Sequence, residues 1–295
     1  MSERRYAFFI GCVTPYREPG YEIATRRVCE ALGIGLEEMA DFNCCGLPID
    51  PVNHEMAMSL AARDIALAEE KGLNIMTLCS GCAGVLTKTN VHLKQSRESR
   101  ERINRYLKEI GKEFKGTIEV KHLARVLVED LGMETLKGYI KRPLKGLKVA
   151  GHYGCHILRP SKYLRFDDSD NPTLLRDLIE LTGATSTGYI DERDCCGAMV
   201  LGVNRDLPMH LIRNKLLKVK DTGANALVTI CPSCHFMFES NQPIAEKMFN
   251  EVYGLPVIHY PQLLGLAMGL SPEELAMDEL RIKPGDLLSH IQGLA

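Results

Sequence analysis

The chain of 295 residues contains 36 Lys and Arg against 38 Asp and Glu, a net charge of −2, so no overall field attracts nucleic acid or an anionic membrane. Hydrophobic residues make up 45% of the chain and charged residues 25%, which excludes a disordered protein and suffices for two domains. Its longest apolar segments, such as Leu263–Met268, are much shorter than the roughly 18 residues of a membrane span. With no secretory signal before Gly11, we expect a soluble protein of the cytoplasm.

Eleven cysteines in a cytoplasmic protein indicate metal binding or redox chemistry, because disulfides are rare in that compartment. Ten of them form two copies of one pattern: a single cysteine, a Cys-Cys-Gly, and a Cys-x-x-Cys. The first copy consists of Cys12, Cys44, Cys45, Cys79 and Cys82, and the second of Cys155, Cys195, Cys196, Cys231 and Cys234. The pairs Val52-Asn53 and Val203-Asn204 follow the two Cys-Cys pairs at equal spacing, so the chain contains an internal repeat. Cys29 has no counterpart, and we expect an ordinary buried residue there.

Short apolar segments that end just before a cysteine predict buried strands. These are Tyr6–Ile10, Asn74–Leu78, Leu147–Val149 and Ala226–Ile230. Periodic apolar residues predict helices over Asn53–Gly72 and Leu207–Lys220. Strands that alternate with helices predict an α/β fold with small, mostly parallel sheets, whose ligands gather at the carboxyl ends of the strands. A charged segment with Pro and Gly at Lys141–Gly146 places the boundary between two tandem, pseudo-symmetric domains, residues 1–142 and 143–295.

The first copy also contains an insertion between Cys82 and His122. Its apolar residues recur at helical spacing over Ser96–Phe114, which predicts a surface helix whose basic face is either solvated or a partner-docking surface. Near the carboxyl end, Ser271-Pro272-Glu273-Glu274 has the pattern of a capping box with Pro at the first helical position, and predicts the start of another helix.

Five cysteines per copy restrict the metal chemistry. Structural zinc takes four ligands and gives no reason for a fifth thiolate or for adjacent cysteines. An ordinary four-iron cubane also needs four thiolates, so the fifth is either a bystander or the sign of an unusual cluster. Gly46 and Gly197, directly after the pairs, supply the turns that would bring both thiolates to one side.

On these residues, the two copies resemble the cysteine-rich CCG domain, and the whole chain resembles the B subunits of the heterodisulfide reductases of methanogens. The resemblance implies that each five-cysteine set holds a noncubane four-iron, four-sulfur cluster. It also implies that the disulfide between coenzyme M and coenzyme B is reduced between the two clusters. Two one-electron clusters suit a disulfide, whose reduction takes two electrons.

The anionic ends of that substrate require cations nearby. Candidates for substrate binding lie just after the first cysteine of each copy, and they are Arg17, His156, Arg159 and Lys162. Solvent-exposed positions are the alternative for all four. His152 and His156, on either side of Cys155, could donate hydrogen bonds to cluster sulfur, whereas His122 and His259 are expected to cap the sheet.

The sequence contains neither a Gly-x-Gly-x-x-Gly loop nor a P-loop, so electrons must come from other proteins. The resemblance implies a small iron–sulfur C subunit as donor, a flavin-containing A subunit, and a larger complex linked to a hydrogenase or a formate dehydrogenase. Two alternatives stay open. One is a CCG subunit of a quinone- or thiol-linked oxidoreductase such as thiol:fumarate reductase, and the other is a zinc-stabilised interaction module.

Overall fold

The computed structural model describes residues 4–293, which form two compact units that exchange segments. The first unit contains the residues up to Cys12, Cys29–Asp130 and His156–Asp170. The second contains Val13–Val28, Leu131–Cys155 and the residues from Asn171 on. In each repeat, therefore, the chain passes directly after its first cysteine into the other unit. The boundary predicted between residues 142 and 143 separates the two copies of the sequence repeat, and it stays a prediction.

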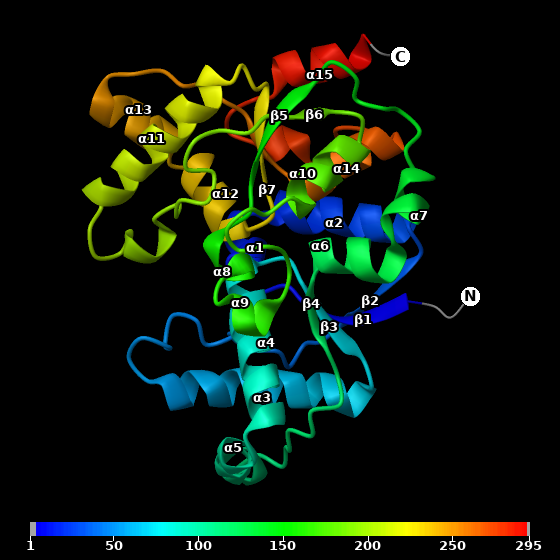
Figure 1. Cartoon of the computed structure of the whole chain (residues 1–295), viewed down its shortest axis with the longest axis vertical. Helices are drawn as coiled ribbons and strands as arrows, with labels where there is room; N and C mark the ends of the chain where they lie inside the picture. The colour runs from blue at the N-terminus through cyan, green and yellow to red at the C-terminus, as the bar shows by residue number, and fades with distance from the viewer. Residues whose placement is uncertain (1–3, 294–295) are drawn as a thin grey trace. The chain divides into compact units, whose positions relative to one another are not determined.

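The first unit contains a parallel sheet of four strands in the order β2-β1-β3-β4 (Figure 1). The strands are β1 (Arg4–Phe9), β2 (Ile34–Glu38), β3 (Asn74–Thr77) and β4 (Val120–His122). Its main helices are α3 (His54–Lys71), α4 (Ser80–Gln95) and α5 (Arg97–Glu109), followed by the short α6 (Leu123–Arg125) and a π-helical turn at Val126–Leu131. The segment His156–Asp170 also belongs to the first unit. It contains α8 (Cys155–Leu158) from its second residue on, and α9 (Ser161–Leu164), which packs on α4.

The second unit repeats this topology, with a parallel sheet in the order β6-β5-β7-β8. The strands are β5 (Lys148–His152), β6 (Thr185–Ser186), β7 (Ala226–Thr229) and β8 (Val257–His259). The longer helices are α2 (Pro19–Ala31, up to Val28), α10 (Leu174–Leu181), α11 (Asp206–Asp221), α13 (Gln242–Phe249), α14 (Tyr260–Met268) and α15 (Gly285–Gln292). The shorter helices are α1 (Thr14–Arg17), α7 (Met133–Lys137) and α12 (Pro232–Phe238).

The strands are buried because helices cover the faces of a parallel sheet. All four residues of β7 are buried, as are Tyr6–Phe9 of β1. The carboxyl ends of β1, β3, β5 and β7 each lead within three residues to a cysteine of the repeat. This confirms the predicted fold class and places the cysteines at one edge of each sheet.

Local signals account for the ends of the helices. The Asn53 side chain accepts a hydrogen bond from the Met56 amide at the start of α3, and Gly72 ends that helix in the left-handed conformation. The predicted helix after Ser271 is wrong. Ser271 and Glu274 do exchange the two hydrogen bonds of a capping box, but the chain makes only a turn there, because Ala276 adopts the left-handed conformation with φ +50° and ends the helical path.

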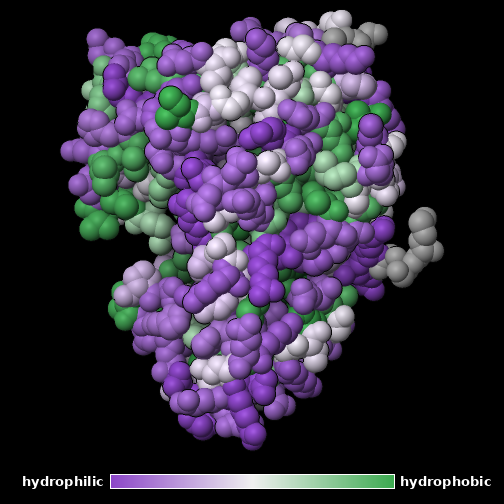
Figure 2. Space-filling view, viewed as in Figure 1, coloured by the Kyte–Doolittle hydropathy of each residue, from purple (hydrophilic) through white to green (hydrophobic). Residues whose placement is uncertain are grey.

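Hydrophilic residues dominate the visible surface, with hydrophobic side chains gathered over α11, α13 and the loop that precedes α11 (Figure 2). The exposed apolar residues of these elements are Met199, Val203, Leu207, Ile244 and Met248. Among the helices that the structure describes, none has the length and apolar character needed to cross a membrane.

Candidate functional site

In the first unit, the structure brings together the five cysteines of the first copy. The thiol of Cys45 is hydrogen-bonded to those of Cys82 and Cys44, and Cys82 is also hydrogen-bonded to Cys79. Cys12 lies close enough for its charge to act on Cys44. The backbone beside Cys12 meets the same group, since a Cβ on Gly11 would lie 3.2 Å from Sγ of Cys82.

In the second unit, the five cysteines of the second copy form one continuous chain of hydrogen-bonded thiols. Cys155 bonds to Cys195, which bonds to its neighbour Cys196. Cys196 then bonds to Cys234, and Cys234 to Cys231. Both sets therefore gather as the repeat predicts, and none of the eleven cysteines, all within the described residues, forms a disulfide.

The glycine after each Cys-Cys pair makes the turn that was predicted for it. Gly46 has φ +92° and Gly197 has φ +82°, both in the left-handed region that a side chain disfavours. A Cβ on Gly46 would also lie only 2.7 Å from the carbonyl oxygen of Ala57. The amide of Gly197 donates to Sγ of Cys195 at 3.3 Å, which favours a thiolate there.

Hydrogen bonds between neighbouring thiols shift their pKa values in opposite directions. Hydrogen bonds from Cys155 and Cys196 lower the pKa of Cys195 to about 2, and the same contact with Cys195 raises the pKa of Cys196 to about 12. Five neighbouring sulfur donors suit iron–sulfur chemistry, whereas a tetrahedral zinc ion would use only four. The residues present therefore fit an iron–sulfur cluster in each unit.

Two buried charged residues that the sequence alone did not single out lie at equivalent positions beside the two sets. Asp64 on α3 and Lys215 on α11 each come twenty residues after the first cysteine of a Cys-Cys pair. Oδ1 of Asp64 accepts a hydrogen bond from the Asn43 amide at 3.0 Å, and burial raises its pKa to about 7. Their equal spacing from the cysteine pairs could have identified them as equivalent positions of the repeat, but nothing in the sequence showed that they are buried.

Lys215 is basic where Asp64 is acidic, and its side chain also binds the backbone just before its cysteine pair. Its Nζ donates to the carbonyl oxygens of Asp191 and, at 3.1 Å, Glu192. It also lies 5.0 Å from the centre of the Tyr189 ring, a cation–π contact. Burial lowers the pKa of Lys215 to about 8, while the charges of Asp194 and of the cysteines Cys234 and Cys196 oppose that effect.

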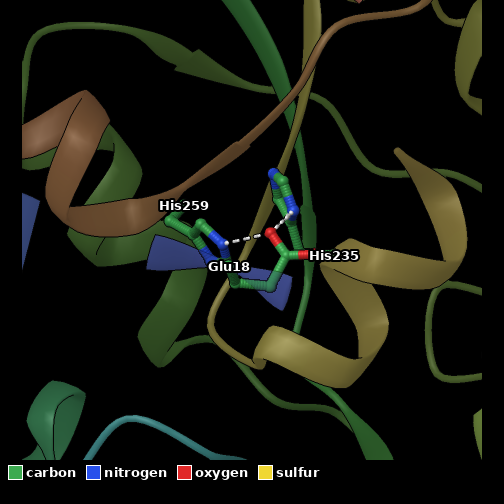
Figure 3. Close-up of side chains that lie close together, drawn as sticks. All are labelled: Glu18, His235 and His259. Atoms are coloured by element: carbon green, nitrogen blue, oxygen red, sulfur yellow. Dashed lines mark hydrogen bonds and ion pairs between the residues drawn. The ribbon is translucent and has the colours of Figure 1, made fainter. Parts of the chain in front are cut away.

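A third buried polar cluster in the second unit consists of Glu18, His235 and His259 (Figure 3). Oε2 of Glu18 lies 2.5 Å from Nδ1 of His235 and 3.5 Å from Nε2 of His259. Burial alone would raise the pKa of Glu18, but the charge of His235 and its hydrogen bond lower it to about 2. The Nε2 of His235 donates to the Val257 carbonyl at 3.0 Å.

This cluster is an ion pair rather than a metal site. The rings of His235 and His259 stack at 3.9 Å with an angle of 20° between their planes. A metal bound by an imidazole lies near the plane of the ring. Because these two rings are stacked nearly parallel, a metal beside Nδ1 of His235 and Nε2 of His259 could not lie near both ring planes. Glu18 therefore joins the segment after Cys12 to the residue that follows Cys234.

The four candidates for substrate binding fall into different units. Arg17 lies in the second unit, where its guanidinium is 5.5 Å from the centre of the Phe236 ring and lines a cavity of about 270 Å³. His156, Arg159 and Lys162 lie in the first unit. Arg159 donates to the Ser169 carbonyl at 3.5 Å, and Nζ of Lys162 lies 4.7 Å from the centre of the Tyr163 ring. Their role in substrate binding stays a prediction.

The remaining predicted residues are buried. His152 lies near enough to Cys231 and Cys195 for their charges to act on it, and its hydrogen bond to cluster sulfur stays a prediction. His152 is buried on β5 with its ring edge-on to Phe238 at 4.9 Å, and burial lowers its pKa to about 3. His122 and His259 end the last strand of each sheet and cap the helix that follows. Cys29 is fully buried on α2.

Comparison with known proteins agrees with this geometry. The model of the cysteine-rich domain CCG matches residues 6–87 and 149–239. The chain is 38% identical, over 97% of both sequences, to the B subunit of the ferredoxin/F(420)H(2)-dependent CoB-CoM heterodisulfide reductase of Methanosarcina acetivorans. It is 33% identical, over 94% of this chain and 96% of the relative, to the 8-methylmenaquinol:fumarate reductase membrane anchor subunit of Wolinella succinogenes.

Among solved structures, a hypothetical protein from Helicobacter pylori has a similar fold, with a TM-score of 0.77 at 16% identity. The match covers 96% of this chain and 53% of that one. With two cysteine-rich domains and heterodisulfide reductase relatives along its whole length, the chain belongs to the CCG-domain family of heterodisulfide reductase B subunits.

Proposed function

We propose that this chain is the catalytic subunit that reduces the coenzyme M–coenzyme B heterodisulfide at two noncubane four-iron, four-sulfur clusters. The observation that carries the proposal is the gathering of five thiols in each unit, at the carboxyl ends of the strands. The reaction takes up two electrons and two protons, breaks the S–S bond and releases two thiols. The clusters would supply the electrons one at a time.

The chain's own residues hold the clusters and shape the surface beside them. Cys12, Cys44, Cys45, Cys79 and Cys82 would bind one cluster, and Cys155, Cys195, Cys196, Cys231 and Cys234 the other. Val52 and Val203, each eight residues after the first cysteine of a Cys-Cys pair, are both 89% exposed.

The partners belong to the proposal as well. No nucleotide-binding loop is present in the sequence, so electrons would arrive from a small iron–sulfur C subunit, supplied by a flavin-containing A subunit in a larger hydrogenase- or formate dehydrogenase-linked complex. The names of the Methanosarcina relatives support a multi-subunit reductase. The cytoplasmic location stays an expectation.

The similarity to the Wolinella succinogenes subunit favours one alternative, a quinone-linked oxidoreductase. Assays of the anaerobically purified complex distinguish the two functions. With reduced viologen as donor, our proposal expects turnover of the heterodisulfide to the two thiols and none of a menaquinone analogue. Turnover of the quinone alone would establish the alternative instead.

A further inference from the structure

Asp64 and Lys215 occupy equivalent positions in the two copies of the internal repeat. Both lie twenty residues after the first cysteine of a pair, both are buried, and both hold the backbone just before that pair. Asp64 does so by accepting from an amide, and Lys215 by donating to two carbonyls. The two otherwise similar cysteine sets therefore have a carboxyl group at this position in one unit and an ammonium group in the other.

The ammonium group of Lys215 is held by the backbone. Lys215 is 3% exposed, and it donates its hydrogen bonds to the neutral backbone carbonyls of Asp191 and Glu192 rather than to their carboxylates. Asp194 and Glu192 act on it electrostatically, as do Cys234 and Cys196 of the second set. In a buried site of low dielectric, such a cation acts over several ångströms with little screening.

A positive charge beside an iron–sulfur cluster stabilises the reduced form, which is the more negative one, and so raises the midpoint potential. At the equivalent place in the first unit, the carboxyl group of Asp64 acts on Cys45 and is paired with Nη1 of Arg63 at 3.4 Å, so the positive charge there is neutralised by a direct partner. Two clusters with matching ligand sets would therefore have different potentials.

We propose that Lys215 tunes the second cluster, the one held by Cys155, Cys195, Cys196, Cys231 and Cys234, so that it is easier to reduce than the first. The proposal rests on the proposed function, because it requires a cluster in each unit. Lys215 is a positioning residue in this account, since it binds the backbone beside the cluster ligands and acts on the cluster through its charge.

Redox titration of the anaerobically purified protein, followed by electron paramagnetic resonance, tests the proposal. The variant Cys234→Ser assigns the signal of the second cluster. Lys215→Gln keeps a hydrogen-bond donor and removes the charge. We therefore expect the equilibrium constant for reduction of the second cluster to fall about tenfold, which lowers its midpoint potential by about 59 mV for one electron. The first cluster should keep its potential. Lys215→Arg, which keeps the charge, should restore most of the shift.

Lys220→Met is the matched control, because it removes the same charge from an exposed position on the same helix, where Lys220 donates to the Val252 carbonyl. An unchanged potential of the second cluster in Lys215→Gln, at normal iron content, would overturn the proposal. So would wild-type clusters of equal potential. Failure of the proposed function gives a different result, because wild-type protein without iron and sulfide would show no cluster signal at all.

Discussion

The carboxylate of Glu18 lies 2.5 Å from Nδ1 of His235, the residue directly after Cys234. Glu18 comes six residues after Cys12, a ligand candidate of the other unit. The segment that follows Cys12 therefore contributes Glu18 to a buried ion pair with the residue next to Cys234. The second repeat has a corresponding contact, since the segment after Cys155 packs its His156 carbonyl so closely on Gly84 that a Cβ there would lie 2.7 Å from the oxygen.

Glu18→Ala should destabilise the second unit strongly. Removing one member of a buried pair leaves the other uncompensated, at a cost of about 3–5 kcal/mol. The half-buried pair of Glu22 and Arg26 lies one turn further along, and Glu22→Ala should cost only about 0–1 kcal/mol because water still reaches both groups. Anaerobic thermal unfolding measures both, and equal losses in the two variants would refute a special role for Glu18.

Gly46→Ala should disturb the first cysteine set. The substitution forces a left-handed backbone on a side chain and brings its Cβ to 2.7 Å from the Ala57 carbonyl, a strain of about 1–3 kcal/mol. Gly72 is the control, because it has φ +66° and no atom within 4 Å of an added Cβ. We expect Gly46→Ala to lose iron while Gly72→Ala keeps it. Full iron content in both would show that the turn is not needed.

Asp64→Asn should stabilise the protein at alkaline pH. The pKa of Asp64 is raised from 3.8 to about 7 by burial, so the folded state binds the proton more tightly than the unfolded state. That contribution is fully present below pH 4 and is lost as the pH rises through 7. Asn keeps the acceptor for the Asn43 amide without the charge, so the variant's advantage over wild type should grow by about 1.4 kcal/mol between pH 6 and 8.5. Parallel melting curves at both pH values would contradict this.

Arg17→Ala and Arg159→Ala test the predicted anion sites. Loss of a charged hydrogen bond costs about 1.5–3 kcal/mol, so each substitution should raise the KM for the heterodisulfide about tenfold to a hundredfold, with normal iron content. If neither variant changes KM, the two arginines are surface residues and the contacts with Phe236 and Ser169 are their whole role.

Most elements could be predicted because their signals are local. The strands before the cysteines follow from short apolar segments, α3 from its periodicity and from Asn53 and Gly72 at its ends, and the two turns from the glycines after each pair. The exchange of Val13–Val28 and His156–Asp170 could not be predicted, because periodicity does not say which sheet a segment packs on. Lys215 was also missed, because a lysine on an amphipathic helix normally faces solvent.

Iron and acid-labile sulfide per chain, measured on protein purified without oxygen, test the central claim most directly. Two clusters predict about eight iron and eight sulfide per chain. About four of each would leave one set empty and contradict the two-cluster account. Two zinc ions without sulfide would contradict the redox function itself and establish a structural module instead.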